Sequence, residues 1–153
     1  MKLVKQTKKG FQYQLNPADA EALRFVVKQF PVTAFTAVQI SRTGSEEEER
    51  EKLLNESLAE HRNDLKRKIR NFIRRDKFKI SGEEQFYRLS LEARETLLQI
   101  LNDIRVESWR ALGEPADLEM SILRLPQGKI RYHQLMRLAG YFECHFLNLE
   151  GVD

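Results

Sequence analysis

The chain has 153 residues, of which 41% are hydrophobic and 32% charged, and its formal net charge is +3 at pH 7. This composition predicts one soluble globular domain over residues 1–153 and excludes a disordered chain, and no stretch approaches the roughly 20 apolar residues of a membrane span. Residues 1–5 begin no apolar signal stretch and the chain has one cysteine, so we expect a cytoplasmic protein that does not act at a membrane.

The N-terminal part of the sequence predicts a β-hairpin followed by a helix. Residues 3–7 and 11–15 have the composition of short strands, and the second alternates strictly between apolar and polar side chains. Asn16 is a suitable helix N-cap and Pro17 suits the first helical position, so a helix is predicted to begin there. The apolar, β-branched segment 32–43 has no clear period, and its conformation stays open.

A long helix is predicted over residues 45–76. Ser45 and Glu48 have the spacing of a capping box, which satisfies free amides at a helix start. At 1.5 Å per residue this helix is about 48 Å long, against a globule about 40 Å across, so one end must project or the helix must bend near Asn63 and Asp64. Side chains that recur every three or four positions form one mainly apolar stripe: Leu54, Leu58, His61, Leu65, Ile69 and Phe72. The histidine of this stripe is expected to be a hydrogen-bonded interior residue.

A second hairpin and two or three more helices are predicted in the remaining chain. The hairpin comprises residues 78–81 and 86–90, and Ser90 then caps a helix that ends at Gly113. A short helix over 117–125 and a last amphipathic helix over 129–147 follow. The predicted fold class is therefore mainly α: a single-domain bundle of about four helices with one or two short β-hairpins. The buried face of the helix after Ser90 is predicted to contain Leu97, Leu98, Leu101, Ile104, Ser108 and Leu112.

The end of the long helix is strongly basic. Residues 60–79 contain nine basic and three acidic residues, a formal charge of +6, which is twice the charge of the whole chain. One interpretation is that these residues stabilise the helix, because the helix dipole favours positive charge at a helix C-terminus. The other is an anion-binding surface that contacts nucleic-acid phosphates without sequence specificity and with strong salt dependence. Its candidate residues are Arg62, Arg67, Arg70, Arg74, Arg75 and Lys77.

A polar cluster interrupts the apolar helix before Gly113; its members are Asn102, Asp103, Arg105 and Trp109. Asn102 and Arg105 share a helix face, and Arg105 precedes Trp109 by four residues, close enough for a guanidinium to lie over the indole ring. The cluster is interpreted either as a polar network that fixes helix packing or as a site for a ligand or partner carrying a carboxylate or phosphate.

Other kinds of chemistry lack a supporting motif. His61, His133, His145 and Cys144 contain no pair at metal-ligand spacing, and no nucleophile has partners at the spacing of a catalytic triad. Cys144 is expected to be a small buried residue. We therefore predict no catalytic residue, no metal site and no cofactor.

The segment 101–105 (Leu-Asn-Asp-Ile-Arg), followed by 110–113 (Arg-Ala-Leu-Gly), resembles the most recognisable part of a bacterial protein family of unknown function. This family is best represented in actinobacteria and is often encoded beside the Clp protease adaptor. Its long basic-ended helix and its aromatic-rich helix would correspond to residues 58–73 and 141–149. The matching positions are Asn102, Asp103, Arg105 and Arg110, whereas Trp109 stands where the family usually has a small residue. The resemblance implies a cytosolic, mainly helical protein, in some members labelled a transcriptional regulator, and it transfers no catalytic residue.

Two functions follow as expectations. The first is a non-catalytic protein-interaction or regulatory module with an unidentified protein partner, and a role in proteolysis is implied only by the resemblance. The alternative is nucleic-acid binding by the basic end of the long helix. An enzyme would need a pocket beside the polar cluster, and self-association through the projecting helix stays open.

Overall fold

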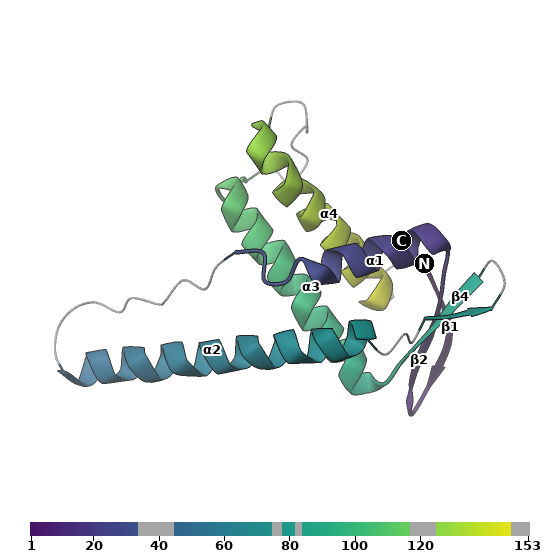
Figure 1. The fold of residues 1–153 in the computed structure, drawn as a ribbon, viewed down its shortest axis with the longest axis horizontal. Helices are drawn as coiled ribbons and strands as arrows, with labels where there is room; N and C mark the ends of the chain where they lie inside the picture. The colour runs from purple at the N-terminus through teal and green to yellow at the C-terminus, as the bar shows by residue number, and fades with distance from the viewer. Residues whose placement is uncertain (34–44, 75–77, 82–83, 117–124, 148–153) are drawn as a thin grey trace.

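The structure is a computed structural model that describes residues 1–33, 45–74, 78–81, 84–116 and 125–147, with the backbone alone at 45, 71–74, 78–81, 84 and 85. These residues form four helices and four strands, which confirms the predicted fold class (Figure 1). In chain order the elements are β1 (Lys2–Thr7), β2 (Gly10–Leu15), α1 (Pro17–Lys28), α2 (Ser45–Arg74), β3 (Phe78–Ser81), β4 (Glu84–Leu89), α3 (Leu91–Leu112) and α4 (Gln127–Leu147). The short helix predicted over 117–125 and most of the open segment 32–43 lie outside the described residues.

The two predicted hairpins join into one sheet, which the sequence did not predict. β1 pairs with β2 and β3 with β4, and β2 also pairs with β4 in the antiparallel sense, with Tyr13 opposite Tyr87. The strand order is β1-β2-β4-β3. Gly10 permits this union because its φ is +149° and a Cβ there would lie 2.2 Å from the carbonyl oxygen of Leu89. Any other residue would push β2 away from β4 at this corner.

The predicted helix ends are confirmed by their caps. The side chain of Asn16 accepts a hydrogen bond from the amide of Asp19, and Ser90 Oγ accepts one from the amide of Ala93 at 3.1 Å. These bonds satisfy free amides in the first turns of α1 and α3. Gly113 ends α3 in the left-handed conformation with φ of 94°.

One face of the sheet is covered by helices. The side chains of Tyr13 and Leu15 on β2 and of Tyr87 and Leu89 on β4 are buried, and α1, α3 and α4 lie on this side of the sheet (Figure 1). α3 and α4 run side by side along most of their length. The core that results also includes Leu23, Val26, Val27, Leu97, Leu101, Ile104, Leu135, Phe142 and Phe146.

A hydrogen-bonded node joins the sheet to two helices. The Tyr13 hydroxyl donates to the backbone oxygen of Phe146 at 3.1 Å, and Arg94 Nε donates to the same oxygen at 2.9 Å. Phe146 is in the last turn of α4, where carbonyl groups have no partner within the helix. The Arg94 guanidinium also lies over the Phe11 ring, 4.3 Å from its centroid. β2, the start of α3 and the end of α4 are thereby fixed to one another.

α2 projects instead of bending. The helix is continuous through Asn63 and Asp64, and its N-terminal half extends beyond the other elements (Figure 1). The predicted apolar stripe is therefore buried only in part: Leu65 and Ile69 are in the core, but Leu54 and Leu58 are 41% and 39% exposed. The prediction that the stripe's histidine at position 61 is an interior residue is wrong, because the contact of α2 with the core ends near that position and the side chain is exposed.

A clamp at Glu107 holds α2 against α3. The Glu107 carboxylate forms an ion pair with Arg62 and accepts hydrogen bonds from the amides of Val32 and Thr33, at 2.8 and 3.1 Å. Arg62 also donates to the carbonyl oxygen of Thr33 at 3.3 Å. Both charged side chains are mostly buried, so each needs the opposite charge of the other to offset its loss of hydration. α2, α3 and the chain that follows α1 meet at this one ion pair.

Replacement of Arg62 by alanine should lower the free energy of unfolding by about 2 kcal/mol, because it leaves the Glu107 carboxylate without its guanidinium. Arg67→Ala is the matched control on the same helix: that side chain is 75% exposed, so we expect a change of about 0.5 kcal/mol or less. Urea unfolding of the wild type and both variants measures the difference. Equal losses in the two variants would contradict the clamp.

Candidate nucleic-acid interface

The basic residues predicted on α2 do not form one free surface. Arg62 is engaged in the clamp with Glu107, and Arg67 pairs with Asp64 on its own helix, Nη2 to Oδ1 at 2.5 Å. Arg70 is exposed. The side chains of Arg74, Arg75 and Lys77 lie outside the described residues. Of the six predicted residues, the structure thus describes the side chains of Arg62, Arg67 and Arg70.

The described basic part of α2 has mixed charge. A shallow hollow of about 450 Å³ runs along it, lined by Glu60, Asn63, Asp64, Arg67 and Arg70. The formal charges of its two carboxylates and two guanidiniums sum to zero. Lys68 forms a further ion pair with Asp64, at 3.1 Å. These intrahelical pairs, first Lys68 and then Arg67, hold the pKa of Asp64 below its usual value. Arg67 and Lys68 are thus engaged with the carboxylate of Asp64, which weakens their attraction for a polyanion.

The outer face of the sheet is a stronger candidate. Gln12 and Gln14 on β2 alternate with the buried Tyr13 and Leu15, so they face away from the helices. Their cross-strand neighbours share that side. We define the outer face by six residues on three adjacent strands: Lys2, Lys5, Gln12, Gln14, Phe86 and Arg88.

A β-bulge brings two lysines to this face. Lys2 is opposite Gln14 and Lys5 is opposite Gln12, but the register shifts by one residue between Leu3 and Lys5. Side chains three positions apart on a regular strand would point to opposite faces, and the extra residue, Val4, restores the same side. The bulge thus places Lys2 and Lys5 on the same surface, although their spacing in the sequence does not fit the alternation of a regular strand.

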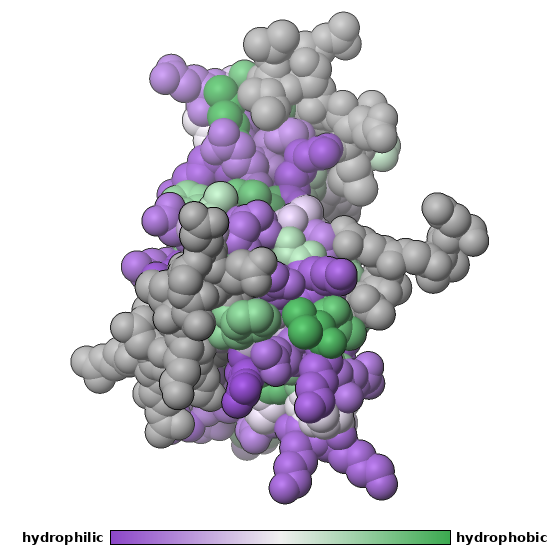
Figure 2. All heavy atoms as spheres, turned by 90° about the vertical axis from the view of Figure 1, so that its right-hand side faces the viewer, coloured by the Kyte–Doolittle hydropathy of each residue, from purple (hydrophilic) through white to green (hydrophobic). Residues whose placement is uncertain are grey.

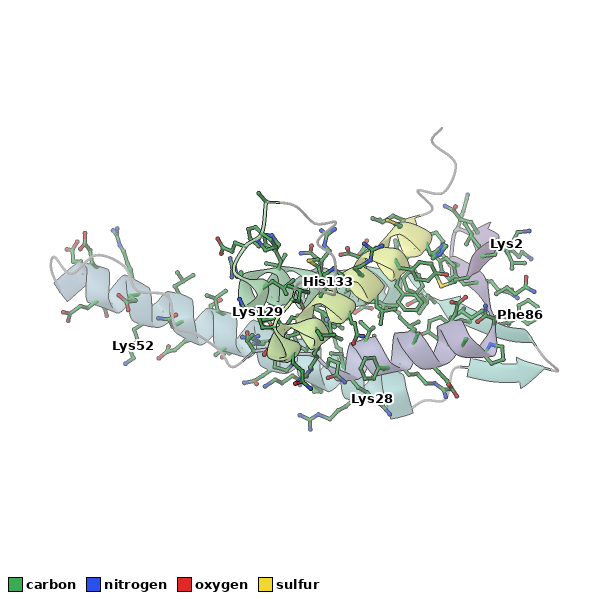
Figure 3. All side chains as sticks on the ribbon, turned by 90° about the horizontal axis from the view of Figure 1, so that it is seen from above. Lys2, Lys28, Lys52, Phe86, Lys129 and His133 are labelled. Atoms are coloured by element: carbon green, nitrogen blue, oxygen red, sulfur yellow. The ribbon has the colours of Figure 1, made fainter. Side chains whose placement is uncertain are left out.

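The outer face is basic and contains one aromatic ring. None of its described side chains is acidic, Lys2, Lys5 and Arg88 are exposed, and Phe86 is partly exposed. Figure 2 views the molecule from the side of the sheet and shows mainly hydrophilic residues around smaller hydrophobic areas. In Figure 3, Lys2 and Phe86 lie at the same end of the molecule. The sequence signal for this surface was four lysines without an acid in residues 1–15.

A hollow of about 400 Å³ adjoins the outer face at the β1–β2 turn. Lys5, Lys9 and Arg88 line it together with Phe11 and with Ser90, the N-cap of α3. Three cations around one concavity, beside the positive end of a helix, suit a phosphate group.

The predicted polar cluster is divided between two sides of α3. Arg105 donates to Asn102 at 3.1 Å and pairs with Glu143 of α4 at 3.2 Å. Asp103 is on the side of α3 that faces α2. Burial, and then the charge of Glu107, raise the pKa of its carboxyl, whereas the charges of His61 and Arg62 lower it by less. The folded chain therefore holds the Asp103 proton more tightly than the unfolded chain, so this group lowers the free energy of unfolding as the pH rises between its ordinary and its raised pKa.

Arg105 also lines a groove between α3 and α4, together with Trp109, the fourth member of the cluster. This interhelical groove has a volume of about 700 Å³ and is mostly apolar, and its lining includes Val106, Met136, Gly140, Tyr141 and Cys144. The Trp109 indole donates to the carbonyl oxygen of Pro115 at 3.1 Å.

The prediction that Cys144 is buried is wrong, because its position on α4 faces the mouth of the interhelical groove and not the core; the thiol is exposed. Beside it, burial raises the pKa of Glu143, and the charge of Arg105 opposes that effect. Within the described ranges, no three His, Cys, Asp or Glu side chains are grouped closely enough to hold a metal ion. None of the described helices is both long enough and apolar enough to span a bilayer.

Comparisons with known proteins give no match: no protein-family model, no curated protein and no solved structure is significantly similar to this chain.

Proposed function

We propose that this chain is a non-catalytic nucleic-acid-binding protein that uses the outer face of its sheet. The observation that carries the proposal is that Lys2, Lys5 and Arg88 lie with Phe86 on one face of a sheet whose opposite face is covered by helices. Lys and Arg contact phosphates without reading the base sequence, so binding should be non-specific and salt-dependent.

Single-stranded nucleic acid is the better substrate class for this surface. A base can stack on an exposed aromatic ring only when it is free of its own duplex neighbours, and Phe86 offers such a ring. Gln12 and Gln14 lie between Phe86 and the lysines, where their amides can hydrogen-bond to sugars or base edges. The basic segment that contains Arg70, Arg74, Arg75 and Lys77 stays a second proposed phosphate contact, because it directly precedes β3 in the sequence and β3 pairs with β4. The protein would act in the cytoplasm, where an exposed lone thiol stays reduced.

The double variant Lys5→Ala/Arg88→Ala should bind a labelled random single-stranded oligonucleotide about tenfold more weakly at low salt, because two phosphate contacts are lost. The slope of log affinity against log salt concentration should fall by about 1.4, at about 0.7 per contact on a single strand. Fluorescence anisotropy at about 50 and 200 mM salt measures both quantities.

Two further variants make this test specific. Lys28→Ala/Lys52→Ala removes the same charge far from the sheet (Figure 3) and should bind like the wild type. Arg70→Ala/Arg74→Ala/Arg75→Ala tests the basic end of α2. If only this triple variant loses affinity while the sheet variant keeps it, nucleic-acid binding belongs to α2 and the proposal for the sheet is wrong.

The interhelical groove favours a second candidate function, a protein-interaction or regulatory module. Val106, Trp109 and Met136 supply an apolar floor, and Arg105 and Arg137 stand beside it. Such a groove suits an amphipathic segment of a partner that has acidic residues along its edge. The resemblance to the bacterial family encoded beside the Clp protease adaptor suggests a partner in regulated proteolysis.

Gly140→Leu should abolish this interaction without unfolding the protein. A Cβ at Gly140 would lie 3.9 Å from Arg105 Cδ, so the backbone accepts a side chain there, and the rest of the leucine would fill the groove. The thermal midpoint should stay equal or rise, because leucine is a better helix former than glycine. A partner captured from a bacterial lysate equally well by the wild type and by Gly140→Leu would show that the groove is not its binding site.

A further inference from the structure

The hollow at the β1–β2 turn gathers three cations around one concavity. Lys5, Lys9 and Arg88 line it, and all three side chains are exposed. No acidic side chain is among the described residues that line this hollow, and none of the three cations forms an ion pair with a described carboxylate. The positive charge here is therefore available to an anion, in contrast to the paired cations along α2.

The turn itself holds Lys9 beside β4. Thr7 Oγ1 donates a hydrogen bond to the carbonyl oxygen of Gly10 and accepts one from the amide of Lys9, both at 3.2 Å. Gly10 lies so close to β4 that a Cβ there would be 2.2 Å from the carbonyl oxygen of Leu89. The backbone that carries Lys9 is thereby fixed against the strand that carries Arg88, so the three cations are brought together before a ligand binds.

The hollow lies where the outer face ends. Phe86 is in one row of paired residues across the sheet, and Arg88, two positions further along β4, is in the next row with Lys5. Two positions on a strand are about 7 Å apart, so one short single strand can place a base on Phe86 and a phosphate in the hollow. β4 ends at Leu89, directly beyond this second row. We therefore expect the end of a bound strand, and not its middle, to reach the hollow.

The charge of the hollow matches a terminal phosphate better than an internal one. A phosphate monoester carries a charge of about −1.5 to −2 at pH 7 and has three acceptor oxygens, whereas an internal phosphodiester carries a single negative charge. The volume of about 400 Å³ admits a monoester with several waters, each of which occupies about 30 Å³. Ser90 Oγ, also in the lining, accepts its hydrogen bond from the amide of Ala93, so its O–H can donate to a phosphate oxygen.

We propose that this hollow binds the terminal phosphate monoester of a single strand that lies on the outer face. The inference rests on the proposed nucleic-acid binding and deepens it, because it selects strands that end in a phosphate over strands that end in a hydroxyl. Lys5 and Arg88 belong to both the outer face and the hollow, whereas Lys9 belongs to the hollow alone. The loss of Lys9 therefore separates terminal recognition from binding in general.

The test uses the full chain and three forms of one internally labelled random oligonucleotide, with hydroxyls at both ends, a phosphate at the 5′ end or a phosphate at the 3′ end. In fluorescence anisotropy at about 50 mM salt, at least one phosphorylated form should bind the wild type about tenfold more tightly than the hydroxyl form, and the two phosphorylated forms show which end is held. Lys9→Ala should reduce this ratio to about two or less and change the affinity for the hydroxyl form by about twofold at most. Lys8→Ala is the matched control: this exposed lysine of the same turn does not line the hollow, so the full ratio should remain.

The outcomes separate this inference from the function on which it rests. If the hydroxyl form binds and neither phosphate improves its affinity, the terminal site is wrong and binding by the outer face stands. A preference that Lys9→Ala leaves intact, or that Lys8→Ala removes equally, would also overturn the hollow as its source. If no form binds at low salt, the proposed function fails as well. Circular dichroism checks folding, and the thermal midpoint of both exposed turn variants should equal that of the wild type.

Discussion

The node formed by Tyr13, Arg94 and the carbonyl oxygen of Phe146 determines which face of the sheet is covered. It fixes β2 to the first turn of α3 and the last turn of α4, with the Tyr13 side chain on the inner face. The positions that flank Tyr13 on β2 must then face outward, which places Gln12, Gln14 and the cross-strand neighbour Arg88 on the other side of the sheet. The proposed binding surface is a direct consequence of how the core is assembled.

The sequence predicted those parts of the fold that depend on neighbours in the chain. Asn16, Ser90 and Gly113 have short-range signals for caps, and the spacing of Leu97, Leu101 and Ile104 defines a helix face, so these predictions are confirmed. The union of the hairpins through β2 and β4 could not be predicted, because it joins strands separated by α1 and α2. The exposure of residues 61 and 144 likewise depends on where whole helices lie, and periodicity does not contain that information.

The candidate site shows the same division. Composition located a basic segment on α2, but it could not show that Arg62 serves as the partner of Glu107 or that Arg67 is paired with Asp64. The outer face was overlooked because Lys2 and Lys5 are an odd number of positions apart, and only the bulge at Val4 brings them to one side. The acidic N-terminal half of α2 projects, whereas the basic half is bound to the core (Figure 1).

The most direct test of the central claim is to map the binding surface in the unmodified protein by amide NMR shifts during titration with a short single-stranded oligonucleotide. We expect the shifts to concentrate on β1, β2 and β4, with Lys5, Gln12, Phe86 and Arg88 among the most affected residues, and to vanish as salt is raised. Shifts confined to α2 or to the interhelical groove, or no shifts at low salt, would contradict the assignment of the outer face as the nucleic-acid-binding surface.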